Sequence, residues 1–522
     1  MVGNITSQFL QDFGRSNKGY GYSGKIGADY YVSEKTVIGV MLDATTNDNQ
    51  QNGLSRANLN ERQQNVQTLS YVNQVNGNGA KFKSLTSNFN IKHDLGKQDA
   101  NITFDLDYAG YSMGRNDSFD AFYLDAAQVQ TSSTNLRNLV EARIDVFAAK
   151  TDFSWPFSKS LKFESGLKSS IVNTNNDFVS EQLSNGQWTD ILGRSNLFIY
   201  KENINAAYAN LSQNWKKWQV QLGLRAEHTH SKGNSVTSNK VVDRDYVSLF
   251  PTVFVKQELT KNHSLNYSYG RRIDRPSYQQ LNPFVQYLDP YTIDSGNPYL
   301  NAQFTNNYEL GYSFKQISLS INYANVRGML VQVSRQNDVT KQIEVQRQNF
   351  GKADLYNANL YVPLKINKIW SMQNNFSARY QAYQDGTLVG AAYLKSKISF
   401  NFNTSQSITL SKTFRAEVSF WYDSPSVRGV EETTIAQYAL NFGLQKTLLQ
   451  NKLKLRLAVD DVLATNYWEG QMKYQNIDMY MKNYYVNRRA SFSLNYSFGN
   501  QQVKSARNRK TAIDDIKGRT GN

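Results

Sequence analysis

Two histidines two residues apart, His228 and His230, are the first candidates for chemistry. At this spacing two side chains lie on one face of a strand, where imidazole rings can share a metal ion. No third ligand is evident near the pair, and the absence of cysteine from all 522 residues removes thiolate ligands, disulfides and a thiol nucleophile. The sequence therefore predicts no metal site, and we interpret the pair as exposed and close to a loop.

Ser112 is a second candidate, because Gly110-Tyr111-Ser112-Met113-Gly114 matches the motif of a nucleophilic serine. That chemistry needs a sharp turn from strand to helix, whereas this motif ends a predicted strand, opens a loop and has no helical pattern after it. The histidines outside the pair, His93 and His263, flank tight turns, away from the serine at the loop end of its strand. The sequence therefore predicts that the chain is not an enzyme.

The segment Gly19 to Gly24 matches a dinucleotide-binding fingerprint only as text. It lacks the buried strand before it and the helix after it whose N-terminus would hold the phosphates, so we predict a glycine-rich loop and no cofactor.

The net charge of +15 raises the question of whether the protein binds nucleic acid. Because the basic residues are dispersed, without a basic helix or zinc motif, nucleic acid is not a predicted partner, and contact with anionic lipopolysaccharide or a lumen wall is favoured.

The candidate residues lie in a chain whose hydrophobic pattern predicts β-strands. From Trp218 to Glu227 every even-numbered residue is apolar and every odd one is polar, charged or glycine, which is the period of a β-strand with two different faces. The same alternation covers Ile102 to Tyr108, Leu453 to Asp460 and Ser491 to Phe498. The sequence predicts an all-β protein.

The connections between strands fall into two classes. Nine are tight: Ser33 to Lys35, Gly96 to Asp99, Phe157 to Ser160, Lys216 to Lys217, Thr260 to Asn262, Lys315 to Gln316, Ile366 to Lys368, Ser411 to Lys412 and Leu448 to Asn451. Between them lie long polar loops, among them Thr45 to Ala80, Gly114 to Arg137, Asn176 to Leu197 and Asp274 to Gln303. Short periplasmic turns and long extracellular loops are typical of a transmembrane β-barrel.

Composition supports a barrel in the outer membrane. Apolar residues are 40% of the chain and aromatic residues 13%, and no stretch approaches the roughly 20 consecutive apolar residues of a spanning helix. Aromatic residues gather beside the tight turns, where a membrane-surface girdle is expected in contact with outer-membrane lipid. They are Tyr30, Tyr31, Trp155, Phe157, Trp215, Trp218, Trp370 and Phe414. A soluble all-β adhesin is the alternative that this girdle disfavours.

The strand count is odd. Nine hairpins and a final strand, about Met479 to Phe498, give about 19 strands, beginning with Gly21 to Val32, whereas bacterial single-chain barrels have even numbers. Residues 1–20 contain no apolar core of a signal peptide. We therefore predict an antiparallel transmembrane barrel over residues 1–498 that lacks its first strands. Residues 499–522 are predicted to be a basic, mobile periplasmic tail.

A family resemblance rests on Arg271 to Tyr312, RRIDRPSYQQLNPFVQYLDPYTIDSGNPYLNAQFTNNYELGY, and on Val459-Asp460-Asp461-Val462-Leu463 near the end. These motifs resemble the outer-membrane β-barrel domain of TonB-dependent receptors, particularly the group common in Bacteroidetes. The resemblance implies about 22 strands, so three strands and the plug domain before them are absent from this chain. It also implies that the plug and TonB are partners only of the full-length protein.

The function that this resemblance implies is uptake of a scarce ligand, such as a siderophore, glycan, vitamin or peptide, across a Gram-negative outer membrane. Inward polar residues are then candidates to line the lumen and hold the plug: Arg225, Glu227, Arg379, Arg415, Glu417 and Arg456. The proline-rich segment adds extracellular-loop candidates, Tyr278, Phe284, Tyr287 and Tyr291, in a loop that either contributes to a ligand site or seals the barrel mouth. The alternative function is a passive porin or a surface-exposed binding scaffold.

Overall fold

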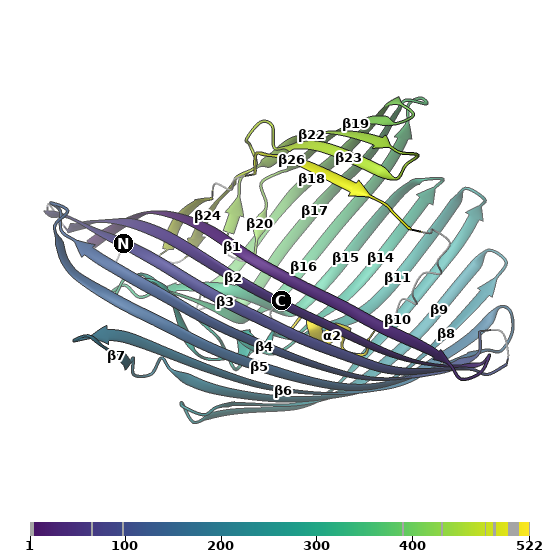
Figure 1. Cartoon of the computed structure of the whole chain (residues 1–522), viewed down its shortest axis with the longest axis horizontal. Coiled ribbons are helices and arrows are strands. Elements are labelled where there is room, and N and C mark those ends of the chain that lie inside the picture. The colour runs from purple at the N-terminus through teal and green to yellow at the C-terminus, as the bar shows by residue number, and fades with distance from the viewer. Residues whose placement is uncertain are drawn as a thin grey trace.

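The computed structural model describes residues 5–63, 66–96, 99–388, 391–429, 432–474, 477–483, 487–499 and 511–520. Most of these residues belong to one strongly curved antiparallel sheet (Figure 1). Along the described chain, 19 successive strands form its wall, in agreement with the predicted count. They are β1 (Ile5–Tyr31), β2 (Thr36–Gln63), β3 (Val66–Asp94), β4 (Asn101–Leu124), β5 (Gln130–Pro156), β6 (Leu161–Ser184), β8 (Asn196–Trp215), β9 (Trp218–Ser235), β10 (Lys240–Thr260), β11 (His263–Asp274), β14 (Gln303–Phe314), β15 (Ile317–Gln336), β16 (Ile343–Lys365), β17 (Trp370–Leu388), β18 (Ala391–Ser411), β19 (Phe414–Asp423), β22 (Gln437–Leu448), β23 (Leu453–Asp460) and β26 (Arg489–Tyr496).

The remaining elements lie in the connections. Three short strands extend the large sheet, namely β7 (Gln187–Asp190), β12 (Val285–Asp289) and β13 (Thr292–Ser295). Four more form a separate small sheet: β20 (Val427–Arg428), β21 (Glu432–Thr434), β24 (Trp468–Tyr474) and β25 (Ile477–Asn483). The described helices, α1 (Tyr278–Leu281) and α2 (Asp514–Lys517), are single turns. No described helix is long and apolar enough to cross a membrane.

Tight turns join the wall strands at the predicted places, apart from the predicted turn Gly96 to Asp99, whose residues 97 and 98 lie outside the described residues. β8 ends at Trp215 and β9 begins at Trp218, and β14 and β15 are likewise separated only by Lys315 and Gln316. Lys216 and Lys315 both adopt positive φ angles, 34° and 53°, which closes a two-residue hairpin with the twist of its strands. The all-β antiparallel fold and the hairpin order predicted from the sequence are confirmed.

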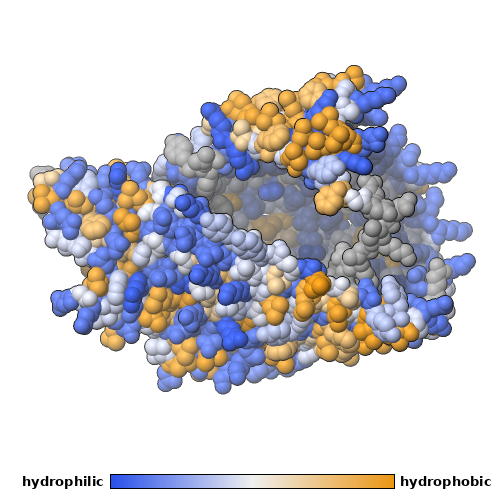
Figure 2. Space-filling model, viewed as in Figure 1, coloured by the Kyte–Doolittle hydropathy of each residue, from blue (hydrophilic) through white to orange (hydrophobic). Residues whose placement is uncertain are grey.

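Alternation gives the wall two different faces. On β9, Leu222 and Leu224 are about half exposed, whereas Glu227 and Thr229 on the opposite face are buried. Apolar side chains that point away from the concave side of the sheet have no protein neighbours to cover them, so a hydrocarbon environment is their natural contact. Figure 2 shows the hollowed interior and apolar residues gathered over β22, β23 and β26.

A row of tyrosines crosses five neighbouring strands on this outward face. The rings of Tyr269, Tyr308, Tyr323, Tyr356 and Tyr380 follow one another at centroid distances of 4.9, 5.9, 4.7 and 6.0 Å. Tyr380 and Trp370 lie ten residues apart on β17. This spacing corresponds to about 34 Å along the strand, and to about 26 Å along the axis of a barrel whose strands are tilted by about 40°. The tyrosine row and the predicted girdle at Trp370 are thus separated by the apolar thickness of an outer membrane, roughly 25 Å.

Three of the predicted long loops are mostly strand. β2 and β3 pair from Thr36↔His93 to Gln63↔Val66, so Thr45 to Ala80 is a continued hairpin. β4 and β5 fill most of Gly114 to Arg137, and β6, β7 and β8 together fill most of Asn176 to Leu197. Here Ala57 and Leu59 face inward and are buried while Arg56 and Asn58 face outward and are exposed. Beyond the membrane the outward residues meet water, so they are polar and the hydrophobic alternation is too weak to read from the sequence.

The chain ends also differ from the prediction. β1 begins at Ile5 rather than Gly21 and pairs with β2 over its whole length, so Gly19 to Gly24 is strand and not loop. Within the described residues, β1 pairs with β2 alone and β26 with β23 alone. Of the predicted tail, residues 499–522, the stretches 500–510 and 521–522 lie outside the described residues. Residues 511–520 were predicted to be solvated and instead pack on the concave side of the wall, where Figure 1 shows α2. Ala512, Ile513 and Ile516 are buried there, and this burial of apolar side chains offsets the tail's loss of freedom.

Candidate functional site

The candidate site lies on the concave face of β8 and β9. The period of a strand puts Glu202 and Ile204 on one face of β8, and the antiparallel register pairs them with Ser231 and Thr229 of β9. Glu227 lies two residues before Thr229, on the same face of β9. Glu202, Glu227 and Thr229 are all buried, whereas the outward His228 between them is exposed. Alternation alone therefore delivers two carboxylates to the interior.

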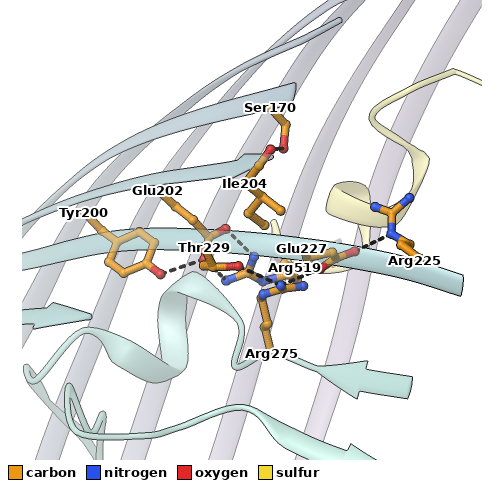
Figure 3. A network of polar contacts seen from close by, with 9 residues as sticks. All are labelled: Ser170, Tyr200, Glu202, Ile204, Arg225, Glu227, Thr229, Arg275 and Arg519. Carbon is orange, nitrogen blue, oxygen red and sulfur yellow. Dashed lines mark hydrogen bonds and ion pairs between the residues drawn. The ribbon is translucent and has the colours of Figure 1, made fainter. Parts of the chain in front are cut away.

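Guanidinium groups hold both carboxylates. Arg225 Nε donates to Glu227 Oε1 at 2.6 Å, and Arg275 Nη2 donates to Glu227 Oε2 at 2.7 Å and to Thr229 Oγ1 at 2.9 Å. Arg519 from the C-terminal segment binds both oxygens of Glu202, at 2.5 and 3.2 Å (Figure 3). Buried charges are stable only when they are paired and hydrogen-bonded in this way.

The two loop groups that meet this network, Arg275 and Tyr278, keep fixed protonation states. Burial lowers the pKa of Arg275, but the hydrogen bond to Glu227 and the nearby charges of Glu227 and Glu202 together outweigh it, so the net shift of the pKa is upward. Burial raises the pKa of the Tyr278 phenol. Arg275 therefore stays charged and Tyr278 stays neutral across physiological pH, so these two groups give the network a fixed positive charge and a neutral aromatic ring.

The loop from Asp274 to Gln303 turns toward this wall and explains the motif residues. Ser277 caps α1 through a capping box with Gln280, directly after Arg275. Only glycine fits at position 296, because a Cβ there would lie 1.7 Å from the carbonyl oxygen of Asn282. Asn297 fixes the far end of the loop, its backbone N–H donating to Gln280 O at 2.7 Å. The motif residues Ser277, Gly296 and Asn297 thus stabilise the loop conformation that packs against the wall.

The four predicted loop aromatics all pack against the wall. Phe284 stacks on Phe178 at 4.3 Å, and Tyr278 lies 5.6 Å from Tyr200. Tyr287 meets Phe119 at 5.1 Å and Tyr291 meets Phe9 at 4.8 Å, each edge to face. Tyr278 and Tyr287 are buried. Of the two roles left open by the sequence, this packing favours a loop that closes over the interior, since these rings are not displayed to an external ligand.

The predicted lumen candidates divide into two groups. Arg225 and Glu227 belong to the buried network just described. Arg456 and Glu417 pair at 3.2 Å but remain 51% and 33% exposed, and Arg379 and Arg415 are exposed. The structure therefore brings two of the six into the site and leaves four elsewhere on the wall.

Several residues of the site were not predicted as site residues, among them Arg275 and the Thr229 hydroxyl to which it donates. Glu202 and Tyr200 lie on β8, inside an alternating stretch that signals strand but gives no sign of a partner, and Arg519 was assigned to the solvated tail. Tyr200 donates its hydroxyl to Glu202 at 2.9 Å. Only folding brings Arg519 next to Glu202, because 316 residues separate them in the chain.

The other chemical candidates are placed without a supporting environment. Ser112 lies inside β4, paired with Lys83 and Arg143, rather than at a strand-to-helix turn. His228 and His230 face outward and contact Asp245 at 3.0 and 3.3 Å. Among the residues that the structure describes, no group of three or more histidine, aspartate or glutamate side chains is placed to hold a metal ion.

The second motif of the resemblance, Val459 to Leu463, also has a structural role. Asp461 directly follows β23 and adopts a left-handed conformation, with φ of 49°. Its carboxylate accepts the backbone N–H groups of Thr465 and Asn466 at 3.0 and 3.2 Å. This buried aspartate builds the turn that leads from the wall into the small sheet.

Comparison with known proteins identifies the family of this chain. A model of the outer membrane protein beta-barrel family matches residues 93–496, most of the chain. The chain belongs to this family. Family membership and fold together assign it to the outer membrane as a β-barrel protein, as predicted. A search of curated proteins gives no match.

Solved structures share the fold at low identity. The ferric yersiniabactin uptake receptor FyuA from Yersinia pestis is 11% identical, with a TM-score of 0.55 over 95% of this chain and 80% of that one. The copper transporter OprC is 11% identical, with a TM-score of 0.57 over 95% and 81%. The FrpB iron transporter from Neisseria meningitidis is 11% identical, with a TM-score of 0.53 over 95% and 82%. At this identity the likeness is one of fold.

Proposed function

We propose that this chain is the barrel of an outer-membrane receptor that imports a scarce ligand, with a plug domain and TonB acting in the full-length protein. The observation that carries the proposal is the size of the wall. The 19 described wall strands exceed the 16 to 18 of porins with aqueous channels and approach the 22 of plugged transporters. In 22-stranded transporters a lumen of comparable width is filled by a plug, and we infer the same arrangement for the full-length protein.

The inner wall supports the same proposal. Arg225, Glu227, Arg379, Arg415, Glu417 and Arg456 give the interior fixed charges, and in the full-length protein they line the lumen and hold the plug. The inward-folded loop between β11 and β14 narrows the entrance, which suits capture of a ligand more than free diffusion. Siderophore, glycan, vitamin and peptide remain the ligand classes, because specificity resides in loops.

The test uses the complete gene product in its own cell. A deletion strain and a complemented strain are compared for growth on a ferric siderophore, a glycan, a vitamin or a peptide as the limiting nutrient, with and without functional TonB. A receptor restores growth on one nutrient only when TonB functions. Growth restored equally without TonB, together with steady conductance in planar bilayers, would show a passive porin instead.

Charge reversal tests the lumen residues. Arg225→Glu and Arg456→Glu in the complete protein are expected to lower uptake or to release the plug to added protease. If both variants import normally and keep the plug protected, these side chains neither line the path nor hold the plug.

A further inference from the structure

The C-terminal segment, residues 511–520, occupies a built pocket on the concave wall. Arg519 donates from Nη1 and Nη2 to the two oxygens of Glu202 and from Nε to the carbonyl oxygen of Pro276 at 3.1 Å. Its guanidinium also lies 4.4 Å from the ring centroid of Tyr278. Glu202 is buried at 2% exposure, and the Arg519 side chain keeps only 13% of its surface exposed. Each of the three guanidinium nitrogens thus donates a hydrogen bond, and an aromatic ring lies against the group.

The pocket also recognises the backbone of the segment. The N–H of Ala512 donates to Asp107 Oδ2 at 2.8 Å, and the N–H of Tyr278 donates to the carbonyl oxygen of Arg519 at 3.3 Å. Between these two anchors Ile513 and Ile516 pack into the cluster that contains Val146 and Phe198. Two polar anchors on either side of an apolar patch define the length and direction of a bound peptide.

We propose that this surface is a binding site for an arginine-bearing peptide segment, and that the chain's own residues 511–520 occupy it as an internal ligand. The site lies on β4, β5, β6, β8 and the loop that begins at Arg275, so an occupant lies across the interior of the barrel. The planar guanidinium matches a carboxylate with two oxygens and an aromatic face, a combination that a lysine ammonium cannot satisfy. The proposal does not depend on the transport function.

Accessibility of a single cysteine tests whether the segment is bound. Because the chain has no cysteine, Ile516→Cys reports on the segment alone, and Leu192→Cys, at a fully exposed position, gives the reference rate. In the 522-residue chain, Ile516→Cys is expected to react with a charged maleimide at least about tenfold more slowly than Leu192→Cys. Equal rates would overturn the proposal.

The carboxylate is tested in the same background. Adding Glu202→Gln removes the charge that holds Arg519 and is expected to raise labelling of Ile516→Cys about tenfold. Glu417→Gln, which removes the carboxylate of a more exposed ion pair on the same wall, is the matched control and should leave the rate unchanged. Heat-modifiable migration on gels verifies that each variant is folded. Protection that survives Glu202→Gln would show that apolar packing holds the segment and that no arginine site exists.

A synthetic peptide distinguishes an internal from an external occupant. In the full chain, Arg519→Gln is expected to release the attached segment from the site. A fluorescent peptide of residues 511–522 with its natural arginine is then expected to bind saturably. A peptide with lysine at position 519 is expected to bind about tenfold more weakly. Binding that disappears in the Arg519→Gln and Glu202→Gln double variant establishes a site open to external peptides. Protection of Ile516→Cys without peptide binding establishes that only the attached segment occupies it, and equal binding of both peptides would overturn recognition of arginine.

Discussion

Two stretches of the wall, β8 to β11 and β17 to β23, carry the same kind of inward residues and differ in what covers them. In the first stretch Glu227 is buried between Arg225 and Arg275. In the second, Glu417 meets Arg456 across the sheet at 3.2 Å, but both remain in contact with solvent. The loop and the C-terminal segment lie over the first pair and not over the second. An ion pair on a barrel wall therefore becomes a structural site only when another segment removes it from water.

The largest effect is expected from Glu227→Gln. The substitution leaves two guanidinium groups facing a neutral amide in a buried setting, and breaking such a pair costs about 3 to 5 kcal/mol. The matched change Glu417→Gln should cost less than about 1 kcal/mol, because solvent screens that pair. Denaturant unfolding of the barrel in lipid vesicles measures both values. Equal losses would remove the distinction between the two stretches.

Tyr287→Ala is expected to release the loop from the first stretch. The ring is buried against Phe119, and loss of a buried aromatic side chain costs about 3 kcal/mol. Limited proteolysis should then cut between Asp274 and Gln303 several-fold faster than in the parent protein. Tyr299→Ala removes an aromatic ring that is 60% exposed in the same loop, and it should leave the cleavage rate as it was.

The outward faces of the two stretches should behave alike. Leu224→Arg on β9 and Leu457→Arg on β23 each place a charge on an exposed apolar position that lies a few residues beyond a tight turn. Each is expected to cost about 2 to 4 kcal/mol of stability in lipid vesicles, the cost of arginine near the bilayer midplane. A negligible cost at either site would place that face outside the membrane.

The smallest effect is a pH dependence of the loop. Burial raises the pKa of Asp289 and of Asp294 above their usual range. A carboxyl with a raised pKa in the folded state favours its neutral form, so its contribution to docking is complete below pH 3.8 and is lost as the pH rises through the raised value. A spin label at Leu288→Cys should therefore become less mobile as the pH falls. Adding Asp289→Asn should weaken that response, and an unchanged response would exclude this carboxyl as its source.

The sequence predicted the frame of the molecule because a strand in a membrane has a strong local signal. Lipid on one face and a polar interior on the other impose strict alternation, as at Leu222 and Leu224, and two-residue turns such as Lys216 to Lys217 are read directly. Above the membrane the same strands lose this contrast. Arg56 and Asn58 alternate with Ala57 and Leu59, and such a polar stretch was interpreted as loop.

The sequence by itself determined the all-β class, the hairpin order, the inward face of Arg225 and Glu227 and the outward face of His228. These features depend on contacts between neighbouring residues and neighbouring strands. Only the tertiary structure decided that the aromatic loop folds inward and that Arg519 meets Glu202, which lies 317 residues earlier in the chain. Such pairings depend on the curvature of the whole wall, which brings distant segments to one concave surface, and no local pattern in the sequence encodes that proximity.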